Sequence, residues 1–465
     1  MSALHMTTGR VLVKLCECGG DAPAHLDVVA GAARPLSSID RGSLDRCVHH
    51  HASAMRVRRV FHASRALAHE GYRAEGFDDA ERDIGLDRVI ALEISSPQRA
   101  YDLADDLNDR DDVEWAMPEP LSLAPMALAP VRSFDARGLT VEQIRSPFER
   151  VGAFEALAME PGDPAINVAV VDTGVALRHP ELTPRISAGV DTVDLGAGPI
   201  GGGAELVGDS DHPDIMAYDE TGHGSHVAGI IAAQGYHMPQ GIGGRSRLVP
   251  VRALAAARGP DGQIVGIGGT MDIDAAVKAA VDLGARVLNL SFGTAEADLP
   301  DDTPPVHSDT IRYAIARGAV PVAAMGNSGR HERYFPAALD GVIAVGAMRP
   351  DGQAASFSTR GEHITLCAPG EDVVSTGLSG YRASTGTSHA APFVAGTVAL
   401  MLARADRAGV QLSAHDCRDL LCRAATPAAP GRHTDETGAG LLNAPRTLSL
   451  LDEFIATKNG GSYGR

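Results

Sequence analysis

Three side chains that lie far apart in the sequence have the types needed for catalysis by a hydroxyl nucleophile. Ser388 lies in the motif GTSHAAP, His223 lies in GHGSHVAG, and Asp172 begins the motif DTG. A serine hydroxyl is a weak nucleophile at neutral pH, so it needs a neutral imidazole to take its proton, and the imidazole needs a carboxylate to fix its tautomer. The residue types therefore predict Ser388 as nucleophile, His223 as general base and Asp172 as the residue that orients the base.

Each of these residues also fits an ordinary structural role. An aspartate after a strand is commonly a turn residue, a single histidine is commonly structural, and a serine at a helix start is commonly an N-cap. The three residues together indicate a catalytic site more strongly than any one of them does alone, because all three occur in glycine-rich surroundings and in the order Asp, His, Ser.

A fourth polar side chain has the chemistry to stabilise a developing negative charge. Asn327 lies in the motif GNSG, after a strand-like run that begins at Ala319. Its amide could donate to a tetrahedral oxyanion together with the backbone N–H of Ser388. The alternative is an ordinary turn, which the composition of this motif suits equally well.

The elements that must position these residues begin at about residue 139, where apolar strand-like runs alternate with helical patterns. The strand-like runs are 166–171, 248–254, 286–290, 319–324, 342–345 and 364–367, and the helical patterns are 223–233, 271–283, 309–317 and 388–405. Apolar strands joined by helices predict an α/β fold with a mostly parallel sheet and helices on both faces. In such sheets reacting groups gather at the carboxyl ends of the strands, where Asp172 is expected, and at helix N-termini, where His223 and Ser388 are expected.

The rest of the chain divides into smaller parts. Residues 1–118 predict a small α+β unit, with strand-like runs at 11–15 and 88–94 and a helix-like stretch at 98–107. Prolines at 118, 120, 125 and 130 predict an extended linker over 119–138, because proline disturbs the interior of both helices and sheets. The large α/β domain is then expected over 139–450, followed by a C-terminal tail at 451–465.

The motifs around Asp172, His223, Asn327 and Ser388 resemble those of the subtilisin-like serine proteases, the subtilase or peptidase S8 family. The resemblance covers roughly residues 139–449. It implies a three-layer subtilisin-like catalytic domain and a serine endopeptidase that forms an acyl-enzyme and needs no cofactor for its chemistry. It also implies that Asp172, His223 and Ser388 are the catalytic triad and that Asn327, with the Ser388 N–H, forms the oxyanion hole.

The resemblance extends to substrate binding and to the N-terminal unit. Substrates of such enzymes bind as an added strand, which implies one edge at Ser291, Phe292 and Gly293 and an opposite edge in the loop 262–269. Tyr334 and Phe335 are expected to wall the primary pocket, with burial in the core as the alternative. The N-terminal unit resembles a prodomain, so we expect residues before about 131 to fold against the catalytic domain as an intramolecular inhibitor of a zymogen, with self-cleavage in the linker.

Two residues depart from the common pattern of the family, and a third residue, Glu181, bears on calcium binding. Ser225 replaces the usual threonine near the catalytic histidine, and His389 stands where methionine is common after the serine. Glu181 matches a position that ligates calcium in relatives, yet the loop between Ile231 and Gly244 offers few carboxylates. A structural calcium ion is therefore possible, and no metal-ligand set is predicted.

Composition limits the classes of partner and the cellular location that we expect for this protein. The formal net charge of -18, from 41 basic and 59 acidic residues, disfavours nucleic acid and anionic membranes as partners, since both attract proteins through Lys and Arg. Six scattered cysteines and the lack of an apolar segment near Met1 predict a cytoplasmic protein with reduced thiols, with secretion as the alternative.

Two rival functions remain. The motif DTG at Asp172 also marks aspartic proteases, but those enzymes need two such aspartates and no second DTG or DSG occurs in the chain. The other rival is a protease-like binding module that has lost catalysis, which an intact set of predicted catalytic residues disfavours.

Overall fold

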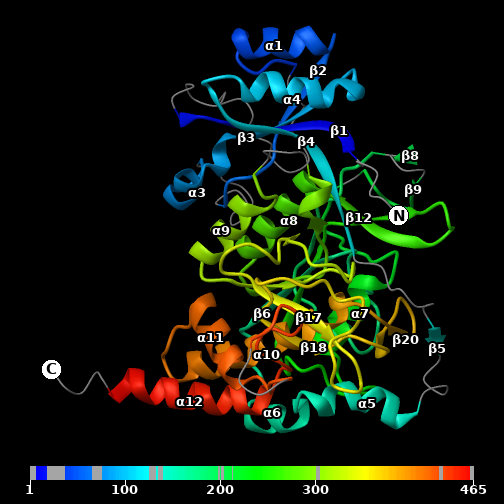
Figure 1. The fold of residues 1–465 in the computed structure, drawn as a ribbon, viewed down its shortest axis with the longest axis vertical. Helices are drawn as coiled ribbons and strands as arrows, with labels where there is room; N and C mark the ends of the chain where they lie inside the picture. The colour runs from blue at the N-terminus through cyan, green and yellow to red at the C-terminus, as the bar shows by residue number, and fades with distance from the viewer. Residues whose placement is uncertain are drawn as a thin grey trace.

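The computed structural model describes residues 7–17, 37–64, 76–124, 132–134, 140–196, 199–200, 204–211, 213–299, 304–428 and 433–460. In Figure 1 the N-terminal elements form a layer at one end of the molecule, and the elements that follow residue 140 make up the larger part below it.

A seven-stranded sheet lies at the centre of the larger part. Its order is β18-β17-β15-β13-β6-β10-β7, and every neighbouring pair is parallel. The strands are β6 (Asn167–Asp172), β7 (Val190–Asp191), β10 (Arg247–Arg252), β13 (Ala285–Leu290), β15 (Val320–Ala324), β17 (Ile343–Met348) and β18 (Leu366–Pro369). The predicted parallel sheet is thus confirmed.

Helices cover both faces of this sheet. Alternate residues of β6 point to opposite faces: Val168 and Val170 join the core beneath α7 and α10, whereas Ala169 and Val171 join the core beneath α8 and α9. The helices of the first face are α5 (Val141–Arg150), α6 (Ala153–Met159), α7 (His223–Ala232), α10 (Thr387–Arg407), α11 (Ala414–Ala424) and α12 (Ala444–Gly460); those of the second are α8 (Thr270–Asp282) and α9 (Ser308–Ala316). This is the three-layer arrangement expected from the sequence.

The N-terminal residues form an antiparallel sheet with α1 and α4 on one side and α3 on the other, an α+β unit. The elements are β1 (Thr7–Leu15), α1 (Ser43–His51), β2 (Met55–Arg59), α3 (Asp79–Ile84), β3 (Val89–Ile94), α4 (Ala100–Asn108) and β4 (Val113–Leu123). Val11, Leu92 and Leu103 belong to the core between this sheet and α1 and α4. The opposite side contacts the larger part, because Leu12 and Leu86 share a buried cluster with Tyr313 of α9.

Strand β4 connects the two parts. It pairs with β1 on one side and with β12 (Ile264–Gly269) on the other, so that one eight-stranded sheet runs through both parts in the order β2-β3-β1-β4-β12-β11-β9-β8. Figure 1 shows β4 extending from the N-terminal layer down to β12. The remaining strands of this sheet are β8 (Pro199–Ile200), β9 (Ala204–Val207) and β11 (Ala255–Arg258).

Two segments differ from the expected linker and tail. Residues 119–123 belong to β4 despite the prolines at 118 and 120, because the β1–β4 register shifts between Thr7 and Val11, opposite those prolines. Helix α12 continues past residue 450 and buries Leu451 completely, so 451–460 is helical. Linker positions 125–131 and 135–139 lie outside the described residues, as does the cleavage point expected near 131.

Short strands and turns complete the fold around the candidate site. They are β5 (Arg132–Phe134), β14 (Thr294–Ala295), β16 (Tyr334–Phe335), β19 (Val373–Thr376) and β20 (Tyr381–Ser384), and β5 pairs with β20. None of the helices in the described part of the chain has the length and apolar character needed to cross a bilayer.

Candidate active site

Asp172 and His223 meet where a strand ends and a helix begins. Asp172 is the last residue of β6 and is fully buried, and His223 is the first residue of α7. Nδ1 of His223 lies 2.7 Å from Oδ1 of Asp172. Gly224 permits this approach, because a Cβ at that position would lie 2.1 Å from the carbonyl oxygen of Gly174. The carboxylate thus holds the Nδ1–H tautomer and leaves Nε2 as the free base.

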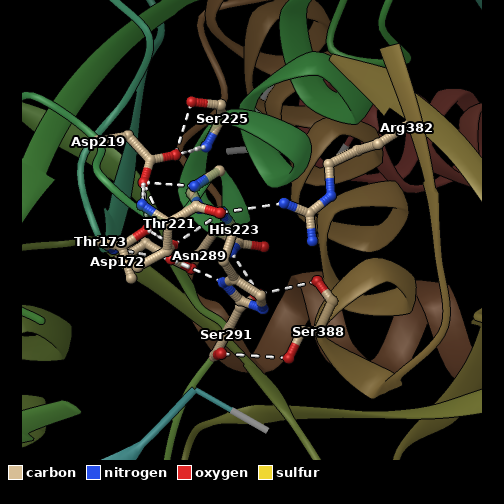
Figure 2. Close-up of polar contacts among 12 residues, drawn as sticks. Asp172, Thr173, Asp219, Thr221, His223, Ser225, Asn289, Ser291, Arg382 and Ser388 are labelled. Atoms are coloured by element: carbon tan, nitrogen blue, oxygen red, sulfur yellow. Dashed lines mark hydrogen bonds and ion pairs between the residues drawn. The ribbon is translucent and has the colours of Figure 1, made fainter. Parts of the chain in front are cut away.

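A second carboxylate, Asp219, ties these two segments together. Its Oδ1 accepts hydrogen bonds from the Thr173 hydroxyl at 2.8 Å and from the backbone N–H of Thr221 and Gly222, each at 2.9 Å. Its Oδ2 accepts from the backbone N–H of Ser225 at 2.8 Å and from its hydroxyl at 2.6 Å. In Figure 2 Asp219 lies above Asp172 and His223, beside the start of α7. Asp219 therefore satisfies the Gly222 and Ser225 N–H groups at the start of that helix and, through Thr173, links them to the end of β6.

Ser388 lies at the start of α10, whose N-terminal N–H groups and partial positive charge favour an anion beside it. Its Oγ donates to the carbonyl oxygen of Ser291 at 3.2 Å, and its own carbonyl oxygen accepts from the Ser291 hydroxyl at 2.9 Å. Among the described residues, no group forms a hydrogen bond with Nε2 of His223, which is buried. The Ser388 hydroxyl and the His223 imidazole therefore share no hydrogen bond, a common state of such pairs without substrate, although the His223 ring lies 5.5 Å from the ring of His389, the residue that follows Ser388.

Asn327 is placed beside the start of α10. Its Oδ1 accepts from the Thr387 backbone N–H at 2.9 Å and from the Thr387 hydroxyl at 3.0 Å. These bonds orient the amide so that Nδ2 faces Gly386, where a Cβ would lie 3.0 Å from Nδ2. Only glycine also suits the φ of 154° at Gly386. The Asn327 amide thus lies beside Gly386 and Thr387, the two residues that directly precede Ser388.

Two further histidines line the base of the site. The ring centroids of His226 and His389 are 4.4 Å apart, and those of His223 and His389 are 5.5 Å apart. Burial lowers the pKa of His226 to about 3 and lowers the pKa of His389 well below its usual value, with the neighbouring histidines acting in the same direction on His389. Both rings are therefore neutral at neutral pH, and His389 packs between His226 and His223 without adding charge.

The two predicted edges form the walls of a cleft, and a segment of this chain occupies it. Leu123 exchanges two backbone hydrogen bonds with Gly293, of 3.2 and 3.1 Å, and the Ala124 N–H donates to the Gly266 carbonyl at 3.0 Å. The Tyr334 hydroxyl donates to the Gly293 carbonyl oxygen at 3.0 Å, so its ring lies behind that edge. Phe292 is fully buried in the core beneath α8 and α9.

Phe335 lies in a different place from Tyr334. It is buried in the cluster that joins the N-terminal layer to α9 rather than along the cleft. The alternation of side chains along β16 explains this difference, because neighbouring residues of a strand point to opposite faces.

The buried carboxylate of Glu181 accepts hydrogen bonds from three backbone N–H groups and one hydroxyl. Its carboxylate accepts from the N–H groups of Gly235, Tyr236 and His237 at 2.8 to 3.1 Å and from the Tyr381 hydroxyl at 3.0 Å. Donor groups pointing at both oxygens do not fit a cation there, because a calcium ligand must present lone pairs to the metal. In the described ranges no group of three or more His, Cys, Asp or Glu residues is arranged to hold a metal.

Sequence reasoning did not single out Asp219, Thr173 or Arg382 as site residues. Arg382 donates to the Thr221 carbonyl oxygen at 3.1 Å, from a strand far away in the sequence. The position of Asp219, just before a glycine-rich helix start, was a usable signal, since carboxylates favour helix N-termini. No local pattern indicates the Arg382 contact.

Comparison with known proteins identifies relatives of the larger part. The model of the subtilase family matches residues 163–440. A thermophilic serine proteinase of Bacillus sp. (strain AK1) is 37% identical over 245 residues, which cover 52% of this chain and 53% of that protein. Thermitase of Thermoactinomyces vulgaris is 30% identical over 286 residues, covering 61% of this chain and 91% of thermitase. The chain spans about half the length of the first curated relatives it matches, 53%, 52% and 56% of each.

Solved protease structures also align with this chain. The prenylagaramide maturation protease PagA aligns with a TM-score of 0.50 and 25% identity, covering 64% of this chain and 98% of that one. A lanthipeptide protease aligns with a TM-score of 0.53 and 22% identity, covering 69% and 99%. The second likeness concerns the fold alone.

Proposed function

Because this chain belongs to the subtilase family, we propose that it is a serine endopeptidase that hydrolyses peptide bonds through an acyl-enzyme on Ser388. The observation that carries the proposal is the 2.7 Å bond between Asp172 and Nδ1 of His223, which leaves a buried and unpartnered Nε2 beside the start of α10. A buried base without a partner costs stability, so its retention is expected where it serves a reaction.

The reaction uses these groups in sequence. When the Ser388 hydroxyl turns from the Ser291 carbonyl to His223, Nε2 takes its proton as Oγ attacks the substrate carbonyl carbon. The Asn327 amide and the Ser388 N–H stabilise the oxyanion, and each such donor contributes about 3 kcal/mol, a magnitude measured in this same family. His223 then gives its proton to the leaving amine, and water releases the acyl group by the reverse roles. Asp172 stabilises the imidazolium in both halves, and no cofactor is needed.

The N-terminal unit acts as an intramolecular inhibitor of this enzyme. Residues 121–124 lie between the two edges at which an extended substrate would bind, which supports this role. Cleavage after position 124 and before Arg132 would free the unit. An incubated chain is expected to lose about a quarter of its length, and a Ser388→Ala chain is expected to stay intact.

Labelling with a fluorophosphonate tests the nucleophile. The parent protein, incubated to allow self-cleavage, is expected to be labelled, and so is the matched variant Ser449→Ala, whose serine lies exposed on α12. The Ser388→Ala protein is expected to lose the label. An unlabelled parent would favour the catalytically silent binding module instead.

A further inference from the structure

The segment in the cleft reveals how a peptide lies relative to the candidate nucleophile. Strand β4 runs antiparallel to β12, with Leu123 opposite Ile267. On its other side Leu123 pairs, also antiparallel, with Gly293. A peptide held by both edges is fully extended, so its alternate side chains point into the enzyme and out of it.

This register locates the bond that would be cut. In an antiparallel pair, moving two residues forward along the peptide from the position of Leu123 means moving two residues back from Gly293, to Ser291. The Ser291 carbonyl oxygen is the group to which Ser388 donates, at 3.2 Å. A substrate in the same register therefore has its last residue before the scissile bond opposite Ser291, and the position held by Ser122 is the fourth residue before that bond.

The side chain at this fourth position enters a polar pocket. Ser122 is completely buried, and its Oγ lies 2.8 Å from the hydroxyl of Thr294 and 3.5 Å from Nε2 of His307. Nδ1 of His307 lies 2.7 Å from Oδ1 of Asp274. Thr294 and His307 are themselves almost completely buried, at 5% and 3% exposed. Phe292 lies against His307, with ring centroids 5.9 Å apart.

Donors and acceptors in this pocket match a serine hydroxyl. Because His307 donates Nδ1–H to Asp274, its Nε2 is an acceptor. The Ser122 hydroxyl can then donate to Nε2 while it accepts the proton of the Thr294 hydroxyl, so each group has a partner. An apolar side chain in the same place would leave the Thr294 hydroxyl and the His307 ring nitrogen buried without partners, and sites of this kind discriminate strongly against a residue that lacks the hydroxyl.

The pocket also carries backbone strain of the kind found at binding sites. His307 adopts a φ of 67°, in the left-handed region that residues other than glycine seldom occupy. It does so immediately before α9, and this conformation directs its ring between Asp274 and the cleft. Such conformations persist where the surrounding contacts hold them, commonly at sites that bind ligands.

We propose that this enzyme selects peptides with serine at the fourth residue before the scissile bond, through Thr294 and the His307–Asp274 pair. The inference rests on the proposed endopeptidase function. It assigns Thr294 and His307 as specificity-determining residues and Asp274 as the residue that positions His307.

Matched peptides test the selectivity. The activated full-length protein, with its active sites counted by fluorophosphonate, is assayed on acetyl-Ser-Leu-Ala-Leu-aminomethylcoumarin and on peptides with alanine or valine in place of the serine. The serine peptide is expected to have a kcat/KM about tenfold higher than either other peptide. Equal rates, or a faster valine peptide, would overturn the inference.

Variants tie the selectivity to the pocket. Thr294→Val is expected to bring the serine-to-valine ratio close to one, and Asp274→Asn to reduce it, while the surface variant Thr457→Val keeps it. The ratio is taken within each variant. A smaller fraction of folded enzyme lowers both rates equally and therefore leaves the ratio unchanged. Unchanged ratios in both pocket variants would contradict the assignment, whereas a parent that neither takes the label nor cleaves any peptide would contradict the proposed function itself.

Discussion

The carboxylate of Asp219 determines how rigidly the candidate base is held. Thr173, which follows Asp172, donates to Asp219, and so do the N–H groups of Thr221 and Gly222 just before His223. The distance between Asp172 and His223 is thus set by bonds to a third residue as well as by their own contact. Catalytic geometry tolerates little error, because small displacements of reacting groups reduce rates strongly.

Replacing Asp219 tests this positioning role. Asp219→Asn puts an NH₂ group in place of one acceptor oxygen, opposite N–H or O–H donors, and is expected to lower kcat by roughly ten- to hundredfold. KM should stay nearly unchanged, because Asp219 does not touch the strand in the cleft. Steady-state kinetics on one peptide gives both values, with Asp419→Asn on α11 as the control. A variant in which KM rises and kcat is retained would contradict positioning of the base.

At the scale of elements, helix starts and strand ends do most of the positioning. The sheet brings the end of β6 beside the starts of α7 and α10, and the two edges beside them accept a strand. The loop at 235–237 is held in a similar way, because its three N–H groups donate to the fully buried carboxylate of Glu181. The carboxylate ties this loop to the core through the hydrogen bonds that it accepts.

Removal of the Glu181 charge should therefore loosen this loop, and calcium should not restore it. Glu181→Gln keeps one acceptor but turns an NH₂ toward backbone donors, so we expect a loss of about 2 kcal/mol and a melting temperature lower by a few degrees. Calorimetry with calcium and with a chelator checks this, and the exposed Glu149→Gln serves as control. A melting temperature of the parent that falls sharply in chelator, with Glu181→Gln unchanged, would show that the loop depends on a metal.

The whole molecule joins its two parts through buried charges as well as apolar contacts. Arg10 of β1 lies 3.4 Å from Glu119 and 3.8 Å from Asp272 of α8, and Lys278 lies 2.6 Å from Glu81. Buried ion pairs are weak sources of net stability, since desolvation offsets their attraction. Burial raises the pKa of Asp272 to about 8, partly offset by Arg10 and reinforced by Glu119. We therefore expect the stability of this junction to depend on pH.

The sign of this dependence follows from proton binding. In the unfolded chain the Asp272 carboxyl ionises near pH 4, whereas in the folded protein it keeps its proton to about pH 8. Its contribution to stability is thus complete below pH 4 and is lost as the pH rises to about 8, at up to about 1.4 kcal/mol per pH unit.

Melting temperatures between pH 5 and 9 measure this effect, in a Ser388→Ala background that cannot cleave itself. Asp272→Asn, which resembles the protonated carboxyl, is expected to flatten the decline in stability with rising pH. The exposed helix residue Asp105 provides a control as Asp105→Asn. Parallel pH profiles for the parent background and Asp272→Asn would contradict the prediction.

The sequence by itself determined the α/β class, the parallel sheet and the membership of the family. It did so because apolar periodicity is a local property and because the motifs around Asp172, His223 and Ser388 are short and contiguous. The roles of these residues, and of Asn327, stay predictions that kinetics must test. Likewise the interior of the linker and its cleavage point rest on sequence alone.

Only the tertiary structure decided which distant residues meet. The contact of Ser122 with Thr294 and His307, the four donors around Glu181 and the placement of Phe335 in the core all join segments far apart in the chain. The same serine or glutamate would suit an exposed surface, since residue type alone does not state which donors and acceptors lie across a cleft. Packing of the sheet, its helices and the N-terminal layer supplies that information.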